Sequence, residues 1–173
     1  MPQWSTAIIV MGVSGAGKST VASRLAQRLH RPLLEGDSFH PPQNIEKMKQ
    51  GIPLADEDRL PWLLAIAARI DAARTAHEPI IVTCSALKRA YRATLAARHS
   101  DVGFVYLKGA KELIAARLAG RNGHFMPPQL LESQFVALQE PTADEPSIVV
   151  AVDAAPDDIV ETIVDKLAMA IRP

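Results

Sequence analysis

A glycine-rich run near the start of the chain constrains the fold more than any other feature of the sequence. Residues 12–19 read Gly-Val-Ser-Gly-Ala-Gly-Lys-Ser and match the pattern G-x-x-x-x-G-K-[ST] in full. A short apolar run precedes the match and a helical pattern follows it, which is the context that the pattern requires. Glycines allow a tight turn that aims backbone N–H groups inward, toward the oxygens of a bound phosphate. The sequence therefore predicts a phosphate-binding loop between a strand and a helix.

The residue types in this loop predict which groups hold ATP and Mg²⁺. Lys18 brings a positive charge to the β- and γ-phosphates, and the hydroxyl of Ser19 is suited to Mg²⁺. Backbone N–H groups and the start of the helix receive the phosphate oxygens. The alternative is a glycine-rich turn that only caps a helix, and the full match in its strand–helix context argues against it. The predicted nucleotide-binding residues here are Gly12, Ser14, Gly15, Ala16, Gly17, Lys18, Ser19 and Thr20.

Apolar runs alternate with helical patterns along the whole chain, which predicts an α/β fold with parallel strands. Continuous apolar strands such as Ile80-Ile81-Val82 suit a sheet that is covered on both faces. We expect a three-layer sandwich with ligands bound outside the carboxyl ends of the strands. The expected strands are residues 7–11, 31–34, 79–84, 102–107 and 147–152. The expected helices are residues 18–29, 44–51, 61–74 (with Pro61 first), 87–98, 110–118, 128–138 and 156–171.

Composition and charge restrict the class of partner. The 173 residues suit one domain, residues 1–173, and an apolar share of 48% provides a core. Lys plus Arg and Asp plus Glu both number 19, so no basic excess points to nucleic acid. No apolar run approaches the roughly 20 residues that span a membrane, and the N-terminus lacks a signal-peptide pattern. The one cysteine allows no internal disulfide. We expect a cytoplasmic protein with small-molecule partners, without nucleic acid or membrane.

The segment after the second expected strand is dense in polar groups and predicts the site of a phosphoryl acceptor. The third expected strand ends in Thr83-Cys84-Ser85, without the aspartate that helps to hold Mg²⁺ in many proteins with this loop. Asp37 would orient an acceptor hydroxyl and take its proton, and Glu35 would hold a metal-bound water. Turn and helix-cap chemistry is the alternative for both carboxylates. His40 lies before two prolines in an extended loop, where a ligand contact and a plain loop role are both open.

Three further cations are candidates for binding an anionic group of the substrate. Arg59 follows an acidic trio, residues 56–58. Lys88 and Arg89 lie at the start of a predicted helix, where positive charge opposes the helix dipole. Such a local conflict is often a mark of function, although a solvated basic surface is the alternative. The sequence does not decide which of the three would bind the anion.

A glycine- and proline-rich stretch predicts a lid over approximately residues 117–138. Arg117 and Arg121, at the start of this stretch, are four residues apart and would share a helix face. Arginines on a mobile segment could close over ATP and neutralise the charge that develops in phosphoryl transfer. A surface helix end is the alternative. Gln134 lies on a mostly apolar helix face, from which it could reach a ligand or pair within the core.

Long runs beyond the phosphate loop resemble the bacterial gluconokinase family. The resemblance extends from residue 8 to about residue 146. It departs at Ala16, where members of that family typically carry Ser, and at Gln139, where they carry Glu. The most specific runs are Glu35-Gly36-Asp37, His40-Pro41, Gly51-Ile52-Pro53-Leu54, Asp56-Glu57-Asp58-Arg59, Cys84-Ser85-Ala86-Leu87-Lys88-Arg89 and Gly123-His124-Phe125-Met126-Pro127.

The resemblance implies a P-loop kinase of the nucleoside-monophosphate-kinase-like fold, with a five-stranded parallel sheet. It also implies a homodimer that uses ATP and Mg²⁺ to phosphorylate D-gluconate at its C6 hydroxyl. The candidate catalytic residues are then Lys18, Asp37 and Arg121. The candidate substrate contacts are Asp37, His40, Arg59, Lys88, Arg89, His124 and Gln134.

Two other functions remain as alternatives at this point. One is a small-molecule kinase of the same fold with a shikimate-like or nucleoside-monophosphate-like acceptor. The low aromatic content of 5% weakly disfavours a nucleotide acceptor, because its base would need rings to stack on. The other is a nucleotide-binding switch without a small-molecule acceptor, which the polar groups after the second strand disfavour.

Overall fold

The computed structural model describes residues 4–121 and 128–170. Within these residues a sheet of five parallel strands has the order β2-β3-β1-β4-β5. This arrangement confirms the predicted α/β class with a parallel sheet. The strands are β1 (Ala7–Met11), β2 (Leu33–Glu35), β3 (Ile80–Thr83), β4 (Val102–Lys108) and β5 (Ser147–Ala151).

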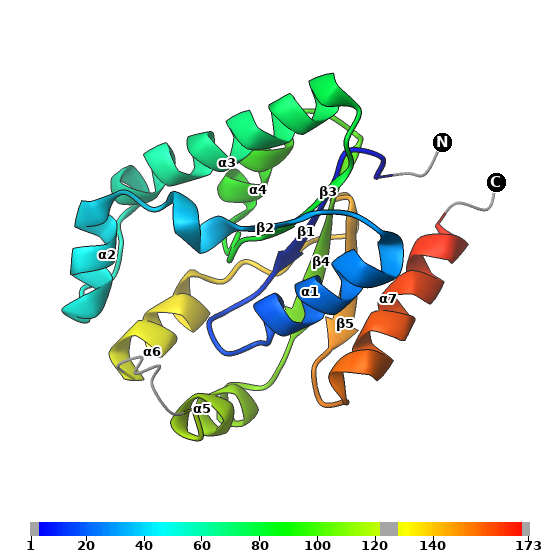
Figure 1. Ribbon diagram of the computed structural model, residues 1–173. Coiled ribbons are helices and arrows are strands. Elements are labelled where there is room, and N and C mark those ends of the chain that lie inside the picture. The colour runs from blue at the N-terminus through cyan, green and yellow to red at the C-terminus, as the bar shows by residue number, and fades with distance from the viewer. Residues whose placement is uncertain (1–3, 122–127, 171–173) are drawn as a thin grey trace.

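Helices cover both faces of the sheet, which confirms the three-layer sandwich (Figure 1). One face packs against α3 (Asp56–Ala76) and α4 (Arg89–Ala96), and the other against α1 (Lys18–Leu29) and α7 (Pro156–Met169). The side chains of β1 alternate between the two resulting cores, as the two-residue period of a strand requires. The remaining helices are η1 (Gly36–Phe39), α2 (Pro42–Lys49), α5 (Lys111–Ala119) and α6 (Pro128–Ala137).

Helix α3 begins at Asp56, so the prediction that Pro61 is its first residue was wrong. The acidic residues 56–58 form the first turn of α3, where negative charge interacts favourably with the helix dipole. The Asp58 carboxylate also accepts a hydrogen bond from the Ala55 backbone N–H at 2.9 Å. These contacts start the helix early and leave Pro61 inside it, where its missing N–H removes one helical hydrogen bond. Arg59 therefore belongs to the first helical turns of α3.

The second strand is shifted along the chain relative to its predicted bounds. Pro32 has no N–H to donate, although its carbonyl accepts from Ile81 at 2.9 Å, and β2 begins at the next residue. The shift places Glu35 on the last position of β2, opposite Thr83 of β3. At Gly36 the chain passes so close to β3 that an added Cβ would lie 2.0 Å from the Thr83 carbonyl oxygen. Only glycine fits at that position.

No helix in the described part of the chain is long and apolar enough to cross a membrane. The other element boundaries differ from the predicted ones by a few residues, as expected where helix and strand ends fray. Residue 171, the predicted end of the last helix, lies outside the described residues.

Candidate active site

The phosphate loop connects the carboxyl end of β1 to the start of α1. Gly12, Gly15 and Gly17 have φ values of 149°, 82° and 95°, which residues with a side chain rarely adopt. The Lys18 ammonium donates to the carbonyl oxygens of Gly12 at 3.1 Å and Val13 at 3.0 Å. The lysine thus folds back over its own loop, which fixes its charge beside the backbone N–H groups.

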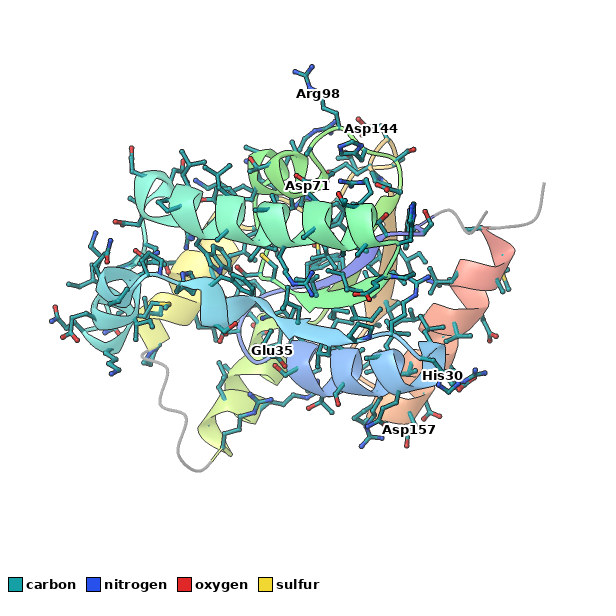
Figure 2. All side chains as sticks on the ribbon, turned by 45° about the horizontal axis from the view of Figure 1, so that its top comes forward. His30, Glu35, Asp71, Arg98, Asp144 and Asp157 are labelled. Atoms are coloured by element: carbon teal, nitrogen blue, oxygen red, sulfur yellow. The ribbon has the colours of Figure 1, made fainter. Side chains whose placement is uncertain are left out.

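The predicted Mg²⁺ residues Ser19 and Glu35 lie against each other. The Ser19 hydroxyl donates to Oε2 of Glu35 at 3.1 Å, and the Thr83 hydroxyl donates to the same oxygen at 2.5 Å. In the sheet β3 lies between β1 and β2, so Glu35 spans across Thr83 to reach the start of α1 (Figure 2). Hard oxygen ligands of this kind suit Mg²⁺. Within the described residues no three His, Cys, Asp or Glu side chains cluster as a metal site.

A cavity of about 310 Å³ lies beside the loop, outside the carboxyl ends of the strands. Its walls come from the phosphate loop, η1, α2, α3, the segment after β3, and α6. The sequence-predicted residues that line it together are Ser14, Lys18, Asp37, His40, Arg59 and Gln134.

Asp37 projects into this cavity from η1 and is solvent-exposed. Asp37 lies in the first turn of η1, whose N-cap residue is Glu35, so Asp37 is not the N-cap of this helix. Burial lowers the pKa of Lys18, and Asp37 is the foremost of the charges that oppose this effect. The carboxylate and the ammonium therefore interact across the cavity. An acceptor hydroxyl would have to lie between the phosphate-binding lysine and a carboxylate such as Asp37.

His40 is a buried residue of the cavity wall with a defined tautomer. Its ring stacks on Trp62 with a centroid separation of 4.1 Å. The Asn44 side-chain NH₂ donates to the Asp58 carbonyl at 2.8 Å and lies 3.3 Å from Nδ1 of His40. Because that NH₂ has only donors, Nδ1 must accept, and the ring proton of neutral His40 lies on Nε2.

Burial also lowers the pKa of His40, which keeps the imidazole neutral at pH 7. The charge of Asp37 raises this pKa and the charge of Arg59 lowers it, so His40 interacts electrostatically with both groups. The imidazole is therefore in electrostatic reach of the carboxylate on η1 and of the guanidinium on α3. A neutral Nε2–H can donate to a substrate oxygen without competing for the hydroxyl proton.

Of the three candidate anion-binding cations, only Arg59 lines the cavity. Its guanidinium donates to the Tyr91 hydroxyl at 3.2 Å and lies 5.6 Å from the centroid of that ring. Lys88 instead pairs with Asp56 at 2.9 Å, and this hydrogen bond raises the pKa of Lys88. The Tyr91 hydroxyl also donates to Asp56, which orders the group behind Arg59.

Arg89 lies away from the cavity. Its guanidinium binds Asp144 and Thr142, at 2.5 Å and 2.8 Å for the shortest contact with each. Figure 2 shows Asp144 on the opposite side of α3 from Glu35. The structure therefore does not bring Arg89 to the predicted substrate contacts.

Of the remaining predicted residues, Thr20, Arg117 and Arg121 lie in the described part of the chain. Arg117 donates to the Val152 carbonyl at 2.5 Å. Arg121 is exposed and lowers the pKa of Lys18, so its charge reaches the loop. Thr20 lines a shallow surface hollow together with Ser19. His124 lies outside the described residues.

Comparisons with known proteins agree with this geometry. A family model described as an AAA domain matches residues 8–141. The thermoresistant gluconokinase of Escherichia coli K12 is 47% identical over 142 residues, which cover 82% of this chain and 81% of the relative. The gluconokinase of Gluconobacter oxydans is 45% identical over 157 residues, which cover 91% and 88% of the two chains. The chain belongs to the gluconokinase family.

The fold agrees with this family as well. A crystal structure of a gluconokinase from Sinorhizobium meliloti matches with a TM-score of 0.88 at 42% identity, covering 97% of this chain and 94% of that one. The similarity confirms the P-loop kinase fold that the sequence predicted.

Several cavity residues of this gluconokinase-family chain were not singled out from the sequence. Ile45, Met48 and Lys49 come from one face of α2, and Lys49 adds a positive charge. Their spacing of three and four residues could have revealed a shared helix face, but not what that face borders. Trp62 forms the wall behind His40. Thr83 joins Glu35 only because of the β2–β3 register.

Proposed function

We propose that the protein transfers the γ-phosphoryl group of ATP to the C6 hydroxyl of D-gluconate, which gives 6-phospho-D-gluconate and ADP. Membership of the gluconokinase family supports this activity. The observation that carries the proposal for this chain is one cavity that holds Lys18 of the phosphate loop, the exposed carboxylate of Asp37 and the guanidinium of Arg59. These are the groups needed for a phosphate donor, an alcohol and a carboxylate.

ATP would bind with its phosphates on the backbone N–H groups of residues 15–19 and on the Lys18 ammonium. Mg²⁺, held by Ser19 and through water by Glu35, would neutralise phosphate charge when bound. Arg117 and Arg121 would contact the nucleotide from the side opposite the loop, and the charge of Arg121 lowers the pKa of Lys18. All of these groups would stabilise negative charge on the phosphates.

Asp37 would position the acceptor hydroxyl and receive its proton. The C6 oxygen attacks the γ-phosphorus while the bond from that phosphorus to the ADP oxygen breaks, and the hydroxyl proton passes to the Asp37 carboxylate. Lys18, which interacts with Asp37, stabilises the charge on the transferring group. His40 would donate its Nε2–H to a hydroxyl of the sugar acid.

The carboxylate of gluconate would bind to Arg59. A guanidinium can hold a carboxylate with two parallel hydrogen bonds, which an ammonium cannot. Lys88 forms an ion pair with Asp56, and Arg89 forms one with Asp144. Arg59 lines the cavity and donates a hydrogen bond to the neutral hydroxyl of Tyr91. Lys49 would add a second positive charge at the open side of the cavity.

We also propose that residues 1–173 form one kinase domain whose lid covers approximately residues 117–138, and that the protein is a homodimer. The two-sided core around a single sheet supports the first statement. Resemblance to the family supports the lid and the dimer. Sedimentation velocity at micromolar concentration would test the dimer, and a sedimenting monomer would contradict it.

An acceptor panel in a coupled ADP-release assay tests the activity. We expect ATP- and Mg²⁺-dependent turnover with D-gluconate, weak or no turnover with shikimate and nucleoside monophosphates, and strongly reduced turnover in Lys18→Met. Turnover with one of the other acceptors in preference to gluconate would favour the alternative small-molecule kinase. ATP hydrolysis that no sugar acid accelerates would favour a nucleotide-binding switch.

A further inference from the structure

One hydrogen bond ties helix α6 to the phosphate loop. The Ser14 backbone N–H donates to Oε1 of Gln134 at 2.7 Å, between residues 120 positions apart in the chain. Both residues line the cavity that also contains Lys18 and Asp37. The loop therefore has a side-chain ligand from α6 at the point where the phosphate site and the acceptor cavity meet.

This contact fixes the orientation of the Gln134 carboxamide. A backbone N–H can only bond to the oxygen end of the amide, so the Nε2 end is turned away from Ser14. In the part of the chain that the structure describes, no protein acceptor is bonded to Nε2. Leu130 and Leu131 of the same helix are buried, and they anchor the turn that carries Gln134. Two N–H donors are thus held at the cavity by a rigid support.

We propose that Gln134 contacts the transferring phosphoryl group: its Oε1 remains bonded to the loop while its Nε2 donates to a γ-phosphate oxygen. The inference rests on the proposed kinase function and adds one donor to Lys18 at the transfer point. A donor fixed before the reaction stabilises developing charge without reorganisation. The same side chain couples the position of α6 to the phosphate loop.

A competing interpretation is that Oε1 only occupies a loop N–H that a phosphate oxygen of ATP later takes. The two interpretations predict opposite results when the side chain is removed. If Oε1 competes with ATP, then Gln134→Leu binds ATP more tightly and keeps its kcat. If Nε2 contacts the phosphoryl group, then Gln134→Leu loses kcat by at least about tenfold, the range of one hydrogen bond to a charged group.

The Gln134→Glu variant separates the role of the Nε2 donor from that of the hydrogen bond between the side chain and the Ser14 N–H. Its carboxylate still accepts from Ser14, so the melting temperature should stay near that of the wild type, but the Nε2 donor is gone. We expect low kcat at pH 8. As the pH falls through the pKa of the introduced carboxyl, its protonated form regains a donor and the kcat ratio of variant to wild type should rise. A purely structural role for Gln134 would not make this ratio depend on pH.

The matched control is Gln129→Leu, the same substitution on an exposed position of α6. We expect its kcat and its KM for ATP and for gluconate to lie within about twofold of the wild type. Unchanged kcat in Gln134→Leu, tighter ATP binding in that variant, or a flat pH ratio in Gln134→Glu would each overturn the inference. If Gln134→Leu fails to fold, the pH series of Gln134→Glu decides. Wild type without gluconate-dependent turnover would overturn the proposed function first, which is a different result.

Discussion

The phosphate loop and the acceptor cavity adjoin, but they are built from different parts of the chain. The loop is one continuous run whose ligands are mostly backbone N–H groups, and even Lys18 is held by carbonyls of the same run. The cavity is built from side chains of η1, α2, α3 and α6, which only the fold brings together. We therefore expect the loop to determine the class of reaction and the cavity to determine which acceptor is used.

Removing Asp37 should produce the largest effect and confine it to the acceptor side. We expect Asp37→Asn to lower kcat by about 10³-fold, within the range for loss of a general base. Affinity for ATP should stay within a few-fold, because the loop does not use this side chain. The coupled assay gives kcat, and calorimetric titration with a non-hydrolysable ATP analogue gives the affinity. Near-normal kcat in this variant would refute the role of Asp37.

Removing the Lys18 ammonium should lower catalytic efficiency almost as much, through the phosphate loop. In Lys18→Met we expect kcat/KM for ATP to fall by roughly 10²- to 10³-fold, about 3 kcal/mol of lost charge stabilisation. Binding of gluconate to the nucleotide-free protein should change little, and equilibrium dialysis with labelled gluconate measures it. A large loss of gluconate binding would show that the two regions are not separable.

Arg59 tests whether the cavity selects a carboxylate. Arg59→Lys keeps the charge and removes the two-pronged geometry, so we expect the KM for gluconate to rise by about 10- to 30-fold, or roughly 1.5–2 kcal/mol. The KM for ATP should not change. Arg89→Met serves as the control because Arg89 pairs with Asp144 outside the cavity. The opposite pattern, with Arg89→Met raising the KM and Arg59→Lys neutral, would reassign the carboxylate site.

The smallest effect is expected far from both regions, at the Arg74–Asp101 ion pair. The hydrogen bond from Arg74 lowers the pKa of Asp101 to about 2. A lowered carboxyl pKa stabilises the fold above the unfolded value near 4, and this contribution disappears as the pH falls toward 2. We expect Asp101→Asn to lower the free energy of unfolding by about 1 kcal/mol at pH 7, after allowance for solvent screening, and by less at pH 3. Urea titrations at both pH values measure it, and the kinetics should be unchanged. An equal loss at both pH values would contradict the electrostatic account.

The phosphate loop, its strand and its helix could be predicted to the residue because the signal is local. Residues 7–11 and 18–29 have the observed bounds of β1 and α1. The first turn of α3 was placed too late because the pattern gave weight to Pro61, while the acidic cap of residues 56–58 dominates. The bounds of an element with one clear start signal can thus be predicted from the sequence. The bounds of an element with two competing start signals cannot.

The acceptor cavity was only partly predictable, for a physical reason. Asp37 and His40 stand out because a dense polar segment follows a strand. By contrast, Arg59, Lys88 and Arg89 look equivalent in sequence, since their partners Tyr91, Asp56 and Asp144 are set by tertiary packing. The contact of Gln134 with the loop depends on the docking of α6, to which no local pattern gives access.

The position of the new phosphate on the product tests the central account most directly. With the carboxylate of gluconate on Arg59 and its far end at Asp37 and Lys18, the terminal hydroxyl must be the acceptor. We predict that ¹³C NMR of the product from uniformly labelled gluconate shows phosphorus coupling at C6 and C5, with no coupling at C1 to C3. Coupling centred on any other carbon, or no phosphorylated sugar acid at all, would contradict the account.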